Sequence, residues 1–209
     1  MTKKPTTADT LRGVRLMKKA LEAARNGPLA APEPVPSMLL KKMTLPNGDP
    51  VSPAMRELFK VDAAWLSIDF DEEEGEIEAV SLEDLIEDEF GEEAIELFGE
   101  AYEILSGDCI VFGGASDSLR FLYVGEPDDL GEYPVMTVMK DPPWIGGFVP
   151  FDVWAAQELG VLASLKAPGA VPPEYEEAAQ ALAELNGDGR LGFTPEPGAG
   201  RDKDSDDDD

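Results

Sequence analysis

The chain has 209 residues, 43% of them hydrophobic, and its 17 Lys and Arg residues face 44 Asp and Glu residues, for a net charge of −27. This length and apolar content fit a folded domain with its own core, whereas the charge argues against binding to nucleic acid or anionic lipid. Because the chain has no histidine and one cysteine, a Ser-His-Asp triad, a Cys-His pair, a histidine-ligated zinc site and an internal disulfide are excluded.

Three features of the sequence indicate the cellular compartment: the N-terminal residues, the lengths of the apolar runs and the number of cysteines. Residues 1–10 carry lysines without the apolar stretch of a secretory signal, and no apolar run approaches the ~18 residues of a membrane span. The single Cys109 suits a reducing compartment, and its apolar neighbours predict a buried core thiol. We therefore expect a cytoplasmic protein that does not contact a membrane.

Residues 1–37 predict a basic helix followed by a proline-rich linker. Apolar residues recur at helical spacing over 8–26, and lysines and arginines fill the other faces. Such a helix either binds an acidic or membrane surface or packs on the acidic remainder of its own chain. Residues 28–37, PLAAPEPVPS, are typical of an extended linker.

Residues 38–165 predict a domain that begins with helices and one strand. Ser52 before Pro53 is a helix start signal, and the alternation in AAWLSIDF over 63–70 predicts a strand. Ser81, with an acid three residues later, resembles a capping box that opens a helix ending at Gly91. A second helix is expected over 92–106.

Strand signals dominate the second half of this domain. They fall at 109–114, 118–125, 132–140 and 144–149, and a helix follows over 150–163. We read the paired glycines in this region as turns or bends rather than as a nucleotide-binding loop, because their spacing fits no phosphate-binding pattern.

The last segment, 166–209, predicts a short helix over 173–185 and then an acidic, disordered tail that ends in DKDSDDDD. The sequence shows no internal repeat.

The acidic residues are concentrated in one block. Between Val61 and Ser118 there are twenty carboxylates and no basic residue, and DFDEEEGEIE at 69–78 is seven-tenths acidic. As a calcium loop this stretch fails, since Gly75 comes one position late and Val80 stands where the twelfth ligand should be. No metal or other cofactor is therefore expected. The block is either a merely solvated face or a surface for a cationic partner.

The stretch from Gly107 to Leu162 carries a more specific signal. An apolar strand, a glycine-rich turn, a second strand ending in Gly-Glu-Pro-Asp, a Gly-Glu-Tyr-Pro-Val strand and a Pro-Phe-Asp-Val-Trp helix start follow in that order. This order resembles the SUKH superfamily, which includes cell-wall assembly regulator-like proteins and many bacterial immunity proteins. The resemblance covers roughly 44–163. It departs from the family at 148–152, FVPFD, which lacks a glycine after the proline.

The resemblance implies an α+β fold, with a mostly antiparallel sheet flanked by helices, and no catalytic constellation. Bacterial members of the family look like antidotes to toxins, many of which act on nucleic acid and so carry a basic cleft. The resulting hypothesis is a non-enzymatic immunity protein that binds a cognate toxin through its acidic surface. The expected toxin contacts are Asp69, Asp71, Glu72, Glu73, Glu74, Glu76, Glu78, Glu83, Glu87 and Asp88.

Two alternatives stay open at this point. A regulatory or scaffold protein of the cell-wall regulator type would bind cellular proteins instead of a toxin. The second alternative is a hydrolase that uses carboxylates alone. With forty-four carboxylates in the chain, however, the sequence does not single out a catalytic pair. Trp65 and Trp144 are expected either as interface anchors or as core residues. The sequence does not predict an oligomeric state.

Overall fold

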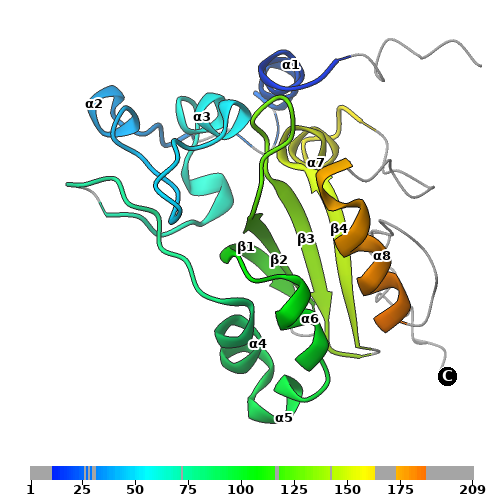
Figure 1. The fold of residues 1–209 in the computed structure, drawn as a ribbon. Coiled ribbons are helices and arrows are strands. Elements are labelled where there is room, and N and C mark those ends of the chain that lie inside the picture. Colours follow the sequence, from blue (N-terminus) through cyan, green and yellow to red (C-terminus); the bar gives the residue numbers. More distant parts are fainter. Residues whose placement is uncertain are drawn as a thin grey trace, which may run out of the picture.

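A central antiparallel sheet with helices on both faces forms the body of the molecule (Figure 1). The computed structural model describes residues 11–162 and 173–186, apart from positions 26, 28, 30, 31, 72, 116, 117 and 142. The predicted acidic tail beyond Asn186 and the first ten residues lie outside this set. None of the described helices is long and apolar enough to span a membrane.

The sheet has the order β1-β2-β3-β4, and every neighbouring pair is antiparallel. Its strands are β1 (Asp108–Ala115), β2 (Ser118–Val124), β3 (Pro134–Met139) and β4 (Trp144–Pro150). All four lie within a few residues of the predicted positions, and the α+β class with flanking helices is confirmed. The predicted glycine bends are register shifts in the β1–β2 and β3–β4 pairs.

Both faces of the sheet are buried, which explains why the strands read as nearly continuous apolar runs. In β2, Phe121 and Tyr123 face one cluster of buried residues, while Leu122 and Val124 face the other. This alternation places one group of helices on each side of the sheet.

The first group consists of α1 (Val14–Ala24), α2 (Ser37–Leu40), α3 (Pro53–Phe59), η1 (Ala64–Leu66) and α7 (Phe151–Glu158). The N-terminal helix packs on its own domain, because its apolar side, including Met17 and Ala20, is fully buried with α3 and α7. Val35, in the expected linker, joins the same cluster and donates its N–H to Phe59 O at 2.8 Å. The described part of 1–37 therefore shares one core with the residues that follow it.

The second group consists of α4 (Leu82–Phe90), α5 (Glu92–Ile95), α6 (Gly99–Ile104), η2 (Pro173–Tyr175) and α8 (Glu176–Leu185). Here the helix start at Ser81 is confirmed, since its Oγ accepts the Asp84 N–H at 3.1 Å. Ser52 likewise caps α3 by accepting the Met55 N–H.

The strand predicted over 63–70 is wrong. This stretch holds the 3-10 helix η1, and Ser67 then takes a left-handed backbone with φ of 53°. A strand would send Trp65 and Leu66 to opposite faces. Instead both reach one core, where the Trp65 ring lies 5.7 Å from that of Trp154. Tertiary packing of these side chains overrides the local alternation.

The single helix predicted over 92–106 is also wrong, because α5 and α6 are separate short helices. Phe98 lies between them with a non-helical backbone and is buried, while Leu97 beside it is 49% exposed. The predicted apolar side chains Phe98, Ala101 and Leu105 nevertheless all reach the core.

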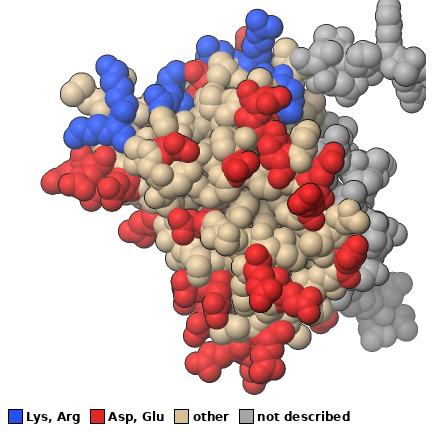
Figure 2. Space-filling view, in the orientation of Figure 1, with Lys and Arg blue, Asp and Glu red and all other residues tan. Residues whose placement is uncertain are grey.

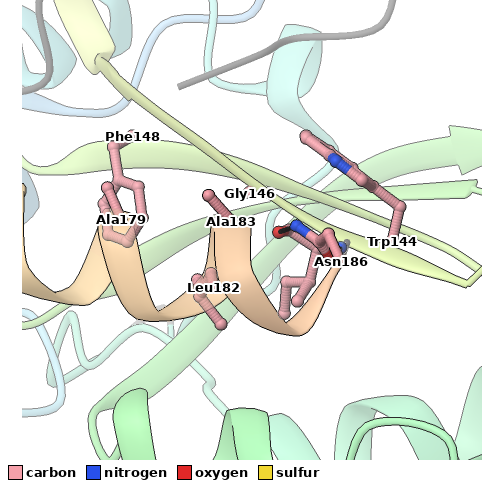
Figure 3. Close-up of a pocket in the computed structure, with 8 residues that line it drawn as sticks. Trp144, Gly146, Phe148, Ala179, Leu182, Ala183 and Asn186 are labelled. Carbon is pink, nitrogen blue, oxygen red and sulfur yellow. Dashed lines mark hydrogen bonds between the residues drawn. The ribbon is translucent and has the colours of Figure 1, made fainter. Parts of the chain in front are cut away.

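Helix α8 covers the outer edge of β4 (Figure 3). The Asn186 side chain imitates a neighbouring strand: its Nδ2 donates to Ile145 O at 2.8 Å, and its Oδ1 accepts the Ile145 N–H at 3.1 Å. The seam beside Asn186 has a cavity of only about 10 Å³, which leaves room for a single water and for no larger ligand. Trp144, 7% exposed, belongs to the protein interior.

Candidate functional site: an acidic surface

On the face shown in Figure 2, basic side chains are gathered at one end, whereas acidic side chains are spread over much of the remainder. In Figure 2, lysine and arginine side chains gather at the top, over α1 to α3, and aspartate and glutamate side chains cover the left-hand projection and the lower end. The projection is the segment 69–78, which we call the acidic tip, and the lower end is α4 to α6, which we call the acidic helices.

The acidic tip is a folded turn rather than a loose spacer. Phe70 pairs with Ile77 in a short antiparallel bridge, and the Asp71 N–H donates to Glu76 O at 2.8 Å. Ile77 is buried, and its N–H donates to Thr44 O at 3.4 Å. The tip is therefore held to the body of the protein, and its described carboxylates are carried on a hydrogen-bonded backbone.

Two residues of the tip serve its own geometry. Gly75 has φ of 82°, and a Cβ there would lie 3.1 Å from Met43 N, so the position requires glycine. Asp71 Oδ1 accepts the N–H groups of Glu73 and Glu74. These hydrogen bonds lower the pKa of Asp71, so this carboxylate stays ionised and also shapes the turn.

The acidic helices present their carboxylates to solvent because their apolar stripes face the sheet. In α4, Leu82, Leu85, Ile86 and Phe90 are buried. The carboxylates of α4 to α6, together with Glu96 directly after α5, are all exposed: Glu83, Asp84, Glu87, Asp88, Glu89, Glu92, Glu93, Glu96, Glu100 and Glu103. The expectation that part of the acidic block is ordered and faces solvent is confirmed.

Few basic groups neutralise this surface. Within the described part of the chain, side-chain ion pairs join Arg12, Lys18, Lys60 and Arg120 to carboxylates elsewhere, and none reaches the tip or the acidic helices. Two lysines contact the backbone of this region: Lys42 Nζ donates to the backbone oxygen of Glu73 at 3.0 Å, and Lys140 Nζ donates to that of Phe90, at the end of α4, at 2.8 Å. Also among the described residues, no group of three or more carboxylates converges as metal ligands would. The negative potential of this region is thus directed outward.

The ten predicted contact residues fall into two neighbouring groups. Glu83, Glu87 and Asp88 lie on α4, and the others lie on the tip. All are exposed except Glu72, which lies outside the described residues. The nine described residues are thus separate surface charges, and none of them lines a pocket that the described structure contains.

The sequence did not reveal a buried polar cluster at the junction of α1 and α7. Asp152, fully buried, accepts hydrogen bonds through Oδ2 from the Gly13 N–H and from Arg12 Nε, the latter at 2.8 Å. The same guanidinium donates to Asp128 Oδ2 at 2.6 Å. These two carboxylates raise the pKa of Arg12 above its ordinary value, although burial acts to lower it. The pairing spans 140 residues, so no local signal announced it.

Glu132 is a second buried carboxylate, 1% exposed. Its Oε2 accepts from Ser52 Oγ at 2.7 Å and its Oε1 from the Ala54 N–H at 2.8 Å, so it braces the start of α3. Burial, opposed by these hydrogen bonds, raises its pKa from 4.5 to about 7. A perturbed carboxylate is a candidate acid or base. Here both oxygens are occupied by the protein and no substrate reaches them, so the role of Glu132 is structural.

Cys109 is fully buried, and burial raises the pKa of its thiol to about 12. The predicted core thiol is confirmed, and at neutral pH this sulfur is neither ionised nor accessible.

Comparisons with known proteins give a structural likeness but no match to a family model or a curated protein. No model of a known protein family matches the chain, and no curated protein matches it. A crystal structure of an uncharacterized protein from Salmonella enterica subsp. enterica serovar typhimurium str. 14028s is similar, with 15% sequence identity and a TM-score of 0.46. The match covers 82% of this chain and 90% of that one. Nothing about function follows from this likeness.

Proposed function

We propose that this protein is a cytoplasmic immunity protein of the SUKH type, which neutralises a cognate toxin by stoichiometric binding. The observation that carries the proposal is the ordered, outward-facing acidic surface, whose carboxylates have no ion-pair partner within the described chain. The sequence resemblance over 44–163 supplies the functional class.

The physical reason for such a surface is complementarity to a basic cleft. A toxin that acts on nucleic acid needs lysines and arginines along its substrate channel. An acidic tip fixed to Thr44 and an acidic helix fixed to the sheet hold their charges in place before the encounter. Long-range attraction speeds the association, and occupation of the cleft excludes the nucleic acid.

The buried thiol and the braced Glu132 support binding rather than catalysis as the function. We expect the full chain to form a one-to-one complex with the product of the adjacent gene and to abolish its toxicity when both are co-expressed. Co-purification and static light scattering measure the stoichiometry.

Catalytic turnover of a small substrate by the chain alone would contradict the proposal. A stable complex with a protein of the cell envelope machinery, and none with the neighbouring gene product, would identify the regulatory alternative instead.

A further inference from the structure

An apolar groove opens beside the acidic tip, and the acidic surface as described above does not use it. Its volume is about 380 Å³, near the lower end of the ~300–1,000 Å³ range of small-ligand pockets. Side chains from three segments line it: the proline-rich stretch, α2, and the chain from η1 to the tip. The lining residues include Val35, Pro36, Leu39, Ala64, Ile68 and Phe70.

The groove is formed in advance of any binding event. The Val35 N–H donates to Phe59 O, and the Ala63 N–H donates to Glu33 O, both at 2.8 Å, so the proline-rich wall is tied to the end of α3 and to the start of η1. Pro34 and Pro36 restrict the backbone further. A preformed groove lowers the entropic cost of ordering the interface.

Apolar surface is left open along this groove. Ala64 is exposed, Leu39 and Phe70 are only half-buried, and Met38 next to Leu39 is 74% exposed. The space and its lining fit one large apolar side chain, of the size of phenylalanine or leucine, better than a polar group.

The charges around the groove determine which kind of polypeptide segment could bring this apolar side chain into it. Glu33 lines the groove, and the exposed Asp69 and Asp71 alternate with the lining residues Ile68 and Phe70. Lys41 and Lys42 lie on the α2 side, and Lys42 is engaged with the backbone of the tip. Glu33 at the groove and the acidic tip that continues from its lining residues favour a segment in which lysine or arginine flanks the apolar residue.

We infer that this groove receives an apolar anchor residue from a Lys/Arg-rich segment of the partner protein. The inference rests on the proposed function and divides the binding between two features. The acidic tip governs how fast the partner arrives, and the groove governs how long it stays, because buried apolar anchors act mainly on dissociation.

The first test uses the full-length chain and a defined probe. A capped peptide, Lys-Arg-Lys-Phe-Lys-Arg-Lys, is titrated into the ¹⁵N-labelled protein, and a second peptide with serine in place of phenylalanine is the control. The phenylalanine peptide is expected to shift the amides of Val35, Ala64 and Ile68 as well as those of the acidic tip, and the serine peptide to shift those of the acidic tip alone. Equal shifts from both peptides would overturn the inference. Shifts at the groove that grow with protein concentration and need no peptide would also overturn it, by identifying a second copy as the occupant.

The second test separates the groove from charge. Ala64→Glu fills the groove while adding a negative charge that a purely electrostatic interface would welcome. We expect this variant to lose the groove shifts and to raise the dissociation rate of the partner complex by about tenfold. The matched control, Gln180→Glu, adds the same charge at an exposed position on α8 and should leave that rate within about twofold.

The two proposals fail in distinguishable ways. If the partner complex forms and Ala64→Glu leaves its dissociation rate unchanged, the groove assignment is wrong and the proposed function stands. If the peptide occupies the groove and the neighbouring gene product does not bind, the groove stands as a site for basic segments, and the toxin assignment falls.

Discussion

The Arg12→Ala variant is expected to lose about 3 kcal/mol of its free energy of unfolding, because it leaves a buried charge without its partner. Asp152 is fully buried, and Arg12 Nε lies 2.8 Å from its Oδ2. After the substitution, the hydrogen bond from the Gly13 N–H would be all that remained on that oxygen. This loss is at the low end of the range for broken buried pairs, since the Arg12 side chain is 34% exposed.

This interaction matters for the fold because it fixes the N-terminal helix. The Asp152 carboxylate lies in the first turn of α7 and, through the Gly13 N–H, also at the start of α1, which has no side-chain cap of its own. One negative charge thus stabilises the positive ends of two helices. Chemical denaturation followed by far-UV circular dichroism measures the loss.

A double-mutant cycle and a surface control sharpen that measurement. Asp152→Asn keeps an oxygen for the Gly13 N–H and removes the buried charge, so it should recover part of the loss when combined with Arg12→Ala. Arg15→Ala removes an exposed arginine three residues away and should change stability by about 0.5 kcal/mol or less. Equal effects of the Arg12 and Arg15 substitutions would contradict the assignment.

Replacing Glu132 with glutamine is expected to stabilise the protein above neutral pH. The folded protein binds a proton at Glu132 up to about pH 7, whereas the unfolded chain releases it near 4.5. The stability that this group contributes is therefore complete below about pH 4.5 and is lost as the pH rises through 7. This shift corresponds to about 3 kcal/mol.

Glutamine imitates the protonated acid at every pH. Its oxygen still accepts from the Ala54 N–H, and its amide N–H donates to Ser52 Oγ in reversal of the present bond. The two proteins should be equally stable near pH 4, and the variant should be more stable at pH 8. Asp129→Asn, an exposed change of the same charge in the same loop, corrects for the general repulsion of an acidic chain. A pH-independent difference between wild type and Glu132→Gln would show that the carboxylate is not held protonated.

Local signals were enough to predict much of this fold. Ser52 with Pro53, and Ser81 with its acid three residues on, mark helix starts within a few residues of sequence, and both caps are present. The strands were predictable because both faces of the sheet are covered, so each strand is an apolar run bounded by turn residues. The exposed acids of α4 followed from its apolar stripe.

The rest depended on contacts distant in sequence. The local pattern around Trp65 predicts a strand, but its conformation is set by packing against Trp154, nearly ninety positions later in the sequence. The pairing of Arg12 with Asp152 and that of Ser52 with Glu132 likewise join separate elements, and no spacing rule connects them. The groove beside the tip was also unpredictable, since its walls come from three segments that meet in the folded protein alone.

A matched pair of variants isolates the acidic tip for the decisive experiment. The tip variant combines Asp71→Asn, Glu72→Gln, Glu73→Gln and Glu74→Gln, and asparagine retains the oxygen that Asp71 uses to close its turn. The control variant makes the same change of net charge at four exposed positions on α8 and the loop before β3, namely Asp129→Asn, Glu176→Gln, Glu177→Gln and Glu184→Gln.

The association rate with the product of the adjacent gene, measured by stopped flow across a salt series, tests the acidic interface most directly. Screening shortens the reach of charges to ~8 Å near 0.15 M salt, so the wild-type rate should fall steeply as salt rises. At low salt the tip variant should associate about tenfold more slowly than the wild type, and the control variant should differ from it much less. A rate that responds neither to salt nor to the four tip substitutions would show that this surface is only a solvated face.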